Sequence, residues 1–229
     1  MIIAHHQKFI FIPIQKTGST SIRNILFKKY NCVVGSSDNS SLIYNHTSAC
    51  RLKLYFEEQK QFPFSEQNLW NWKDYFKFTF VRNPYARLVS QYNYFCKIGS
   101  NPQKIIGLNG GGEFTYPTEY YNLCKEINKK SFKHFVQNNQ NNFDVPYSWF
   151  CLNEFDFIGK TENMQTDFDK VIEKANKNLA NAFTKKIIIP HYNKSTKKHY
   201  SDYYDDETKK IAEKFYGEDI ERFKYKFGE

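Results

Sequence analysis

The sequence predicts an α/β fold with a mainly parallel central sheet flanked by helices, in a single domain over residues 1–229. Short apolar segments followed by a polar loop and an amphipathic helical pattern recur along the chain. Strands that are apolar on both faces are typical of a buried parallel sheet. A chain of this length can bury one core, and no linker rich in proline or serine divides it.

The first strand, loop and helix are predicted in the segment FIFIPIQKTGSTSIRNIL. Residues 9–14 are apolar on both sides of the pleat, and residues 15–20 form a polar loop. Ile22, Ile25 and Leu26 then recur at helical spacing. Because a loop that enters a helix presents backbone N–H groups at the helix N-terminus, this segment predicts an anion site. We call residues 15–20 the anion loop.

The residues expected to hold the anion are Lys16, Thr17, Gly18, Ser19, Thr20 and the following Ser21. The usual phosphate-loop pattern G-x-x-x-x-G-K-[ST] is absent, since the lysine precedes the only glycine of the loop, which disfavours a nucleoside triphosphatase. The order K-T-G-S-T after an apolar strand resembles the 5′-phosphosulfate loop of sulfotransferases, especially the family that includes the carbohydrate O-sulfotransferases. The alternative is a hydroxyl-rich helix cap with one solvated lysine.

The segment FTFVRNPYARLVSQY predicts a second strand over residues 78–81 and a helix that begins at Pro84. It resembles the 3′-phosphate motif of the same family, which matches Arg82 at the end of the strand and Ser90 eight residues later. A guanidinium fork and a hydroxyl suit a phosphate dianion. The alternative is that Arg82 caps carbonyl groups and that Ser90 faces the core. The resemblance is favoured because the two motifs, for the 5′-phosphosulfate and for the 3′-phosphate, occur in the expected order.

Further elements follow from the spacing of apolar residues. Helices are expected at residues 48–60 and 131–138, strands at 155–159 and 187–190, and an aromatic segment beneath the second strand at 68–75. Residues 99–117 show little periodicity and read as a flexible excursion, either a substrate-facing loop or a disordered insertion.

The resemblance extends over nearly the whole chain and implies a P-loop-like three-layer sandwich. It includes an E-N pair that makes Glu162 a scaffold or active-site-wall residue, with scaffold favoured. It also includes an N-K-S segment that tends to lie near the nucleotide in relatives, so that Lys194 and Ser195 are expected to bind the donor. His191, just before this segment, is a candidate for the substrate side of the site.

The resemblance implies transfer of a sulfuryl group from 3′-phosphoadenosine 5′-phosphosulfate to a hydroxyl of a carbohydrate or glycoconjugate acceptor. In such an in-line transfer negative charge builds on the departing 5′-phosphate, where Lys16 and the N–H groups of the anion loop can stabilise it. His46 is the first candidate for the general base, since its N-H-T-S-A context resembles an H-x-x-A segment of relatives, and His191 is the second. A packed or substrate-orienting histidine is the alternative for His46.

No metal is expected, because no carboxylate or His/Cys cluster has ligand spacing.

The composition of the chain bears on its partners, its cysteine chemistry and its location. The net charge of +9 favours anionic partners, yet the basic residues are spread along the chain and no nucleic-acid motif is recognisable. Five cysteines without a C-x-x-C pair indicate neither a zinc site nor a disulfide framework. Without a signal peptide or an apolar run long enough to span a bilayer, a reducing cytoplasm is the expected location. The oligomeric state stays open.

Two other functions compete with the sulfotransferase. A non-catalytic nucleotide- or nucleic-acid-binding module would use the same loop and Arg82 but would not need His46, so full activity of a His46→Ala protein would favour it. A nucleotide or sugar kinase shares the fold class, but it would require magnesium and acidic metal ligands, and the missing phosphate-loop pattern argues against it.

Overall fold

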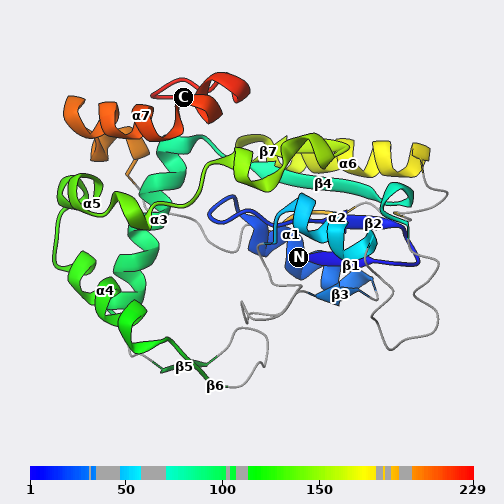
Figure 1. Cartoon of the computed structure of the whole chain (residues 1–229), viewed down its shortest axis with the longest axis horizontal. Coiled ribbons are helices and arrows are strands. Elements are labelled where there is room, and N and C mark those ends of the chain that lie inside the picture. Colours follow the sequence, from blue (N-terminus) through cyan, green and yellow to red (C-terminus); the bar gives the residue numbers. More distant parts are fainter. Residues whose placement is uncertain are drawn as a thin grey trace. The chain divides into compact units, whose positions relative to one another are not determined.

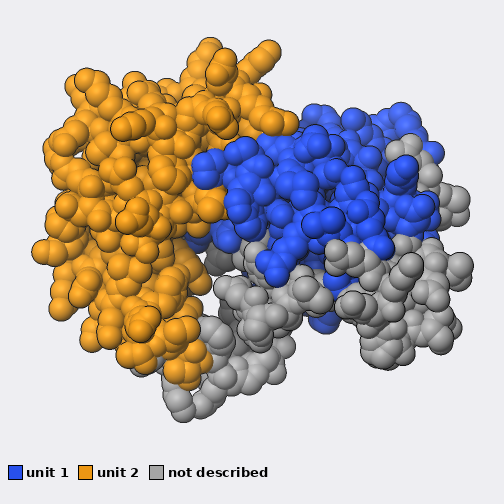
Figure 2. Space-filling view, viewed as in Figure 1, with its two compact units in different colours: residues 1–82, 146–194 blue, residues 83–145, 195–229 orange. Residues whose placement is uncertain are grey.

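The computed structural model describes residues 1–30, 32–34, 47–57, 71–101, 104–106, 113–178, 183, 187–190 and 198–229. The chain divides into two compact units, coloured separately in Figure 2: unit 1 comprises residues 1–82 and 146–194, and unit 2 residues 83–145 and 195–229. Each unit has a hydrophobic core of its own. That the two units act as one domain over residues 1–229 stays a prediction.

A five-stranded mixed sheet forms the frame of unit 1 (Figure 1), with the strand order β3-β1-β2-β4-β7. The strands are β1 (Ile2–Ala4), β2 (Phe9–Phe11), β3 (Val33–Val34), β4 (Phe76–Val81) and β7 (Phe157–Lys160). Strand β4 pairs in parallel with β2 and β7, whereas β1 pairs antiparallel with β2 and β3. The prediction of a mainly parallel sheet is therefore wrong for this edge. The reason is the short turn between β1 and β2, since so short a connection can join only antiparallel strands.

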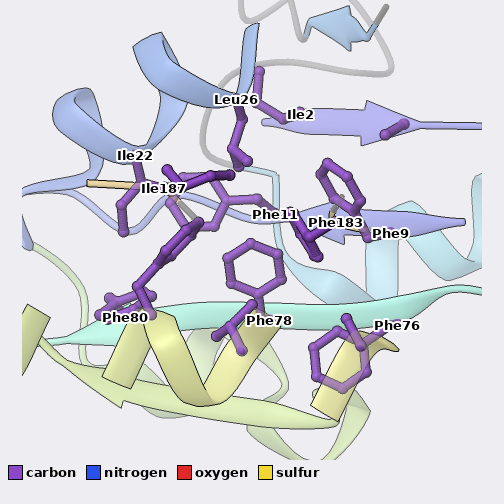
Figure 3. Packing of buried hydrophobic residues seen from close by; sticks show 14 of the residues in the cluster. Ile2, Phe9, Phe11, Ile22, Leu26, Phe76, Phe78, Phe80, Phe183 and Ile187 are labelled. Carbon is purple, nitrogen blue, oxygen red and sulfur yellow. The ribbon is translucent and has the colours of Figure 1, made fainter. Parts of the chain in front are cut away.

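Aromatic side chains of β2 and β4 make the core of unit 1. Phe9 and Phe11 alternate with residues of the opposite face, and the ring of Phe11 stacks on that of Phe78 with centroids 5.1 Å apart. Figure 3 shows these rings gathered with Ile22 and Leu26 of helix α1 (Ser19–Lys29). Helix α6 (Met164–Asn178) adds buried residues to the same cluster. Both helices that flank the predicted site are thus fixed to the sheet by apolar burial.

The remaining helical elements of unit 1 are short. They are α2 (Ala49–Glu57) and the 3₁₀ turns η3 (Trp72–Asp74), η5 (Tyr147–Phe150), η6 (Leu152–Glu154) and η7 (Thr161–Asn163). The expected helix over residues 48–60 corresponds to α2, and its last three positions lie outside the described residues.

Unit 2 is mainly helical. Its elements are α3 (Pro84–Gly99), β5 (Lys104–Ile106), β6 (Glu113–Thr115), α4 (Thr118–Asn128), α5 (Phe132–Asn138), η4 (Gln140–Asn142), η8 (Tyr200–Tyr203) and α7 (Asp206–Phe223). Leu88, Val89 and Phe95 of α3 are buried in its core, and their spacing places them on one face of the helix. Asn83 caps α3 through its side chain, and Pro84 occupies the first turn as expected.

Two local predictions are corrected by the structure. Residues 99–117 contain an antiparallel pair, β5 with β6, so the expected excursion has regular structure within it. Residues 187–190 do not form a strand. Instead the Gln165 side-chain amide donates to the carbonyl of Ile187 (3.0 Å) and accepts from the N–H of Ile189 (2.8 Å), so a side chain takes the place of a neighbouring strand.

The expectation that the cysteines form no disulfide is also wrong. Cys50 at the start of α2 and Cys151 after η5 are bonded, with Cα atoms 5.8 Å apart. These two residues are 101 positions apart in the sequence, so only the tertiary fold brings them together.

Candidate functional site

The candidate site of unit 1 lies where its three mutually parallel strands end. The anion loop follows β2, Arg82 follows β4 and Thr161 follows β7. The carboxyl ends of parallel strands are the usual ligand-binding edge of such sheets. The hydroxyl of Thr161 lies 2.9 Å from the carbonyl oxygens of both Thr17 and Val81, so one side chain ties the three strand ends together.

The anion loop is held in shape by its own backbone and by one buried hydroxyl. Lys16 and Gly18 have positive φ angles of 63° and 70°. Thr17 is completely buried, and its hydroxyl donates to the carbonyl of Ile14 at 3.0 Å. The hydroxyl of Thr17 is therefore used within the loop, which differs from the side-chain role that a hydroxyl-rich loop indicates.

Gly18 is the N-cap of α1 and provides no side-chain cap to the N–H groups of the first turn. Ser19 and Thr20, which open this turn, are half-buried, whereas Ser21 is buried and its N–H donates to the carbonyl of Gly18 at 3.1 Å. A helix N-terminus without a side-chain cap is suited to an external acceptor such as a phosphate or sulfate oxygen.

Arg82 connects the two segments that the sequence singled out. Its guanidinium Nη1 donates to the carbonyl of Lys16 at 3.3 Å. Its backbone is held by Tyr147, whose hydroxyl accepts from the Arg82 N–H (2.8 Å) and donates to the Arg82 carbonyl (2.7 Å). Arg82 is half-buried, and its guanidinium lies beside the anion loop within unit 1.

The end of β7 is fixed from α6. Asp167, which is 7% exposed, accepts from the N–H of Lys160 at 2.8 Å and from Lys170 Nζ at 2.8 Å. This carboxylate anchors the residue just before Thr161. Glu162, the next residue, is exposed in η7.

The structure brings together some of the predicted site residues. Lys16, Arg82 and the first turn of α1 are neighbours in unit 1, while Ser90 lies half-buried in α3 of unit 2. Four predicted residues lie outside the described residues: His46, His191, Lys194 and Ser195. Sequence reasoning missed Thr161 and Tyr147, because a threonine beside Glu162 and a tyrosine in a loop carry no signal of the backbone groups that they bond.

Two further observations concern only the described part of the chain. No group of three or more His, Cys, Asp or Glu side chains there could hold a metal ion. No helix there is both long and apolar enough to cross a membrane.

An α/β unit with an anion loop and an arginine at the carboxyl ends of parallel strands is typical of proteins that bind phosphorylated nucleotides. A family model described as the sulfotransferase family matches residues 1–226. Since the match covers almost the whole chain, the chain belongs to this family, sulfotransferase family 2. No curated protein and no solved structure matches it. Membership supports sulfotransfer as the general activity and implies a sulfonate donor and an acceptor substrate.

Proposed function

We propose that the chain transfers a sulfuryl group from 3′-phosphoadenosine 5′-phosphosulfate to a hydroxyl of a carbohydrate or glycoconjugate, releasing 3′,5′-adenosine bisphosphate. The observation that carries this proposal is the hydrogen bond between the Arg82 guanidinium and the Lys16 carbonyl. It joins the segment that resembles the 3′-phosphate motif to the segment that resembles the 5′-phosphosulfate loop. Two anion-binding groups side by side suit a donor with a phosphate at each of two positions.

The donor is proposed to bind through both segments. The N–H groups at the start of α1 and the Lys16 ammonium hold the 5′-phosphosulfate, and the Arg82 guanidinium holds the 3′-phosphate. Ser90, Lys194 and Ser195 are proposed as further donor contacts on the strength of the sequence alone. We propose a P-loop-like three-layer sandwich as the fold that carries this site.

The transfer is proposed to be in line and to need no metal. The bond between sulfur and the 5′-phosphate oxygen breaks while a bond forms between sulfur and the acceptor oxygen. The departing phosphate gains negative charge, which Lys16 and the N–H groups of the anion loop stabilise. The acceptor hydroxyl gives its proton to a base, for which His46 is the first candidate and His191 the second. Glu162 and His191 are candidates for the acceptor side of the site.

The donor site is tested by calorimetric titration with 3′,5′-adenosine bisphosphate, 5′-AMP and ATP. We expect the wild type to prefer the bisphosphate. We expect Arg82→Ala to lose about 10- to 100-fold in affinity for the bisphosphate, because a charge-assisted contact is lost, and little for 5′-AMP. The control is Arg222→Ala, which removes an exposed arginine in the last turn of α7. A wild type that binds all three nucleotides equally contradicts the proposed donor.

The base is tested with radiolabelled donor and a panel of oligosaccharide acceptors. We expect His46→Ala to lower kcat about 10²- to 10⁴-fold, as loss of a general base does, and to leave the affinity for 3′,5′-adenosine bisphosphate unchanged. His191→Ala is the matched comparison, and a larger loss there would move the role to His191. A protein that binds the bisphosphate selectively but transfers no sulfate to any acceptor would point to the non-catalytic binding module.

A further inference from the structure

A tyrosine of the turn formed by η5 and η6, residues 147–154, holds the backbone of Arg82. Tyr147 has no solvent exposure, and its hydroxyl bonds both the N–H and the carbonyl of Arg82. Strand β4 ends at Val81, so the N–H and the carbonyl of Arg82 lie beyond the hydrogen bonds of the sheet. One phenol therefore fixes the backbone of the residue whose guanidinium is proposed to bind the 3′-phosphate.

The other end of the 147–154 turn, at Cys151 and Glu154, is attached to α2 and η3. Cys151, four residues after Tyr147, is bonded to Cys50 at the start of α2. Glu154 then accepts from Lys53 Nζ of α2 at 3.0 Å and from Trp72 Nε1 of η3 at 2.9 Å. One covalent bond and two hydrogen bonds thus attach this end of the turn to α2 and η3.

The direction of a guanidinium fork depends on the backbone that carries it. A bidentate contact with a phosphate is strong only when both N–H groups point correctly, and a shift of about 1 Å is enough to weaken it. We propose that Tyr147 is a positioning residue that aims Arg82 at the 3′-phosphate, and that the Cys50–Cys151 disulfide supports this role by holding the turn. The inference rests on the proposed function, since it assumes a donor with a 3′-phosphate.

A structural role alone would give a different result from a positioning role. If Tyr147 only stabilised unit 1, its loss would lower the melting temperature but leave the ratio of affinities for 3′,5′-adenosine bisphosphate and 5′-AMP unchanged. A positioning role lowers that ratio, because only the bisphosphate uses Arg82. The ratio is therefore the decisive measurement.

The first test compares Tyr147→Phe with Tyr75→Phe by calorimetric titration of the full chain. Tyr75 is the matched control, since it is a buried tyrosine of the same unit whose hydroxyl bonds His5 Nδ1 at 2.7 Å. We expect Tyr147→Phe to lower the affinity for the bisphosphate about tenfold, as loss of two hydrogen bonds would, and to change that for 5′-AMP much less. Tyr75→Phe should keep the wild-type ratio. An unchanged ratio in a folded Tyr147→Phe protein overturns the inference.

The second test removes the disulfide. A dithiol reductant gives two electrons and two protons to the Cys50–Cys151 bond, which becomes two thiols, and is itself oxidised to a disulfide. We expect reduction to lower the affinity for the bisphosphate about threefold, less than Tyr147→Phe does, because the phenol is kept and only its support is loosened. The variant with Cys50→Ser and Cys151→Ser should show the same loss without any response to the dithiol.

The outcomes separate this inference from the proposed function. A wild type without preference for the 3′-phosphate overturns both. A wild type with that preference, whose affinity is the same after complete reduction, overturns the role of the disulfide. If Tyr147→Phe does not fold, the doubly substituted variant is the test: a ratio of affinities for the bisphosphate and 5′-AMP equal to that of the wild type overturns the proposal that the 147–154 turn aims Arg82.

Discussion

Gly18 occupies a position in the anion loop where any side chain would be strained. Its φ of 70° lies in the left-handed region, and a Cβ there would overlap Cε of Met164 at the start of α6. The methionine end could move aside, so the backbone angle is the stronger constraint. Because the N-cap residue is a glycine and has no side chain, α1 begins without a side-chain cap, which is the feature that suits an anion.

His5 illustrates how burial of a single residue makes stability depend on pH. It lies in the turn between β1 and β2, and its Nδ1 is 2.7 Å from the hydroxyl of Tyr75. Burial, followed by the charges of Lys8 and His6, lowers the pKa of His5 to about 4. Between pH 6.5 and 4 the unfolded chain therefore binds a proton that the folded protein does not, and the free energy of unfolding falls as the pH is lowered.

We expect His5→Gln to remove this part of the pH dependence. Because His5 is only half-buried, its contribution between pH 7 and pH 5 should be about 1 kcal/mol, less than the full pKa difference would give. Urea unfolding of the wild type and the variant at both pH values measures it. The lost hydrogen bond to Tyr75 is shared by both conditions, so the values at pH 7 provide the control. Equal pH dependence in the two proteins would contradict the expected pKa.

Elements with strong local patterns were predictable. The apolar run of β4, the proline at the start of α3 and the spacing of Leu88, Val89 and Phe95 each specify an element through neighbours in the sequence. Strands β1 and β3 have only three and two residues, too few to show a periodicity, and so the antiparallel edge of the sheet was missed. Residues 187–190 have a strand-like pattern, but Gln165 supplies the hydrogen bonds that a strand would have made.

The candidate site also contains residues that the sequence predicts and residues that it does not. The positions of residues 15–20 and of Arg82 at the ends of strands could be predicted, because a strand, a short polar loop and a helix determine them locally, whereas their binding of an anion stays a prediction. Thr161 and Tyr147 could not, since each bonds backbone groups of segments that are distant in sequence. The Cys50–Cys151 bond was missed for the same reason: spacing along the chain says nothing about two cysteines that only the tertiary fold brings together.

Each of the two compact units of the molecule buries an aromatic core. Phe9, Phe78 and Phe168 belong to the core of unit 1, and Phe135 and Tyr216 to that of unit 2. With 18% aromatic residues, the chain fills both cores with rings in edge and stacked contacts. The anion loop and Arg82 both lie in unit 1, so the hydrogen bond that joins them is formed within one compact unit.

The charge of the whole chain should be visible in donor binding. Lysine and arginine number 33 against 24 aspartate and glutamate residues, which gives the net charge of +9. A positive field attracts a nucleotide that carries two phosphates, and salt screens such a field within about 10 Å at 0.1 M and about 3 Å at 1 M. We therefore expect the affinity for 3′,5′-adenosine bisphosphate to fall at least about threefold between low and high salt, as measured by calorimetry. Arg82→Ala should show a shallower dependence, because Arg82 is one of the cations proposed to contact the ligand. An affinity independent of salt would contradict this expectation, and would mean that neutral hydrogen bonds from the helix N-terminus bind the nucleotide with no measurable help from the basic residues.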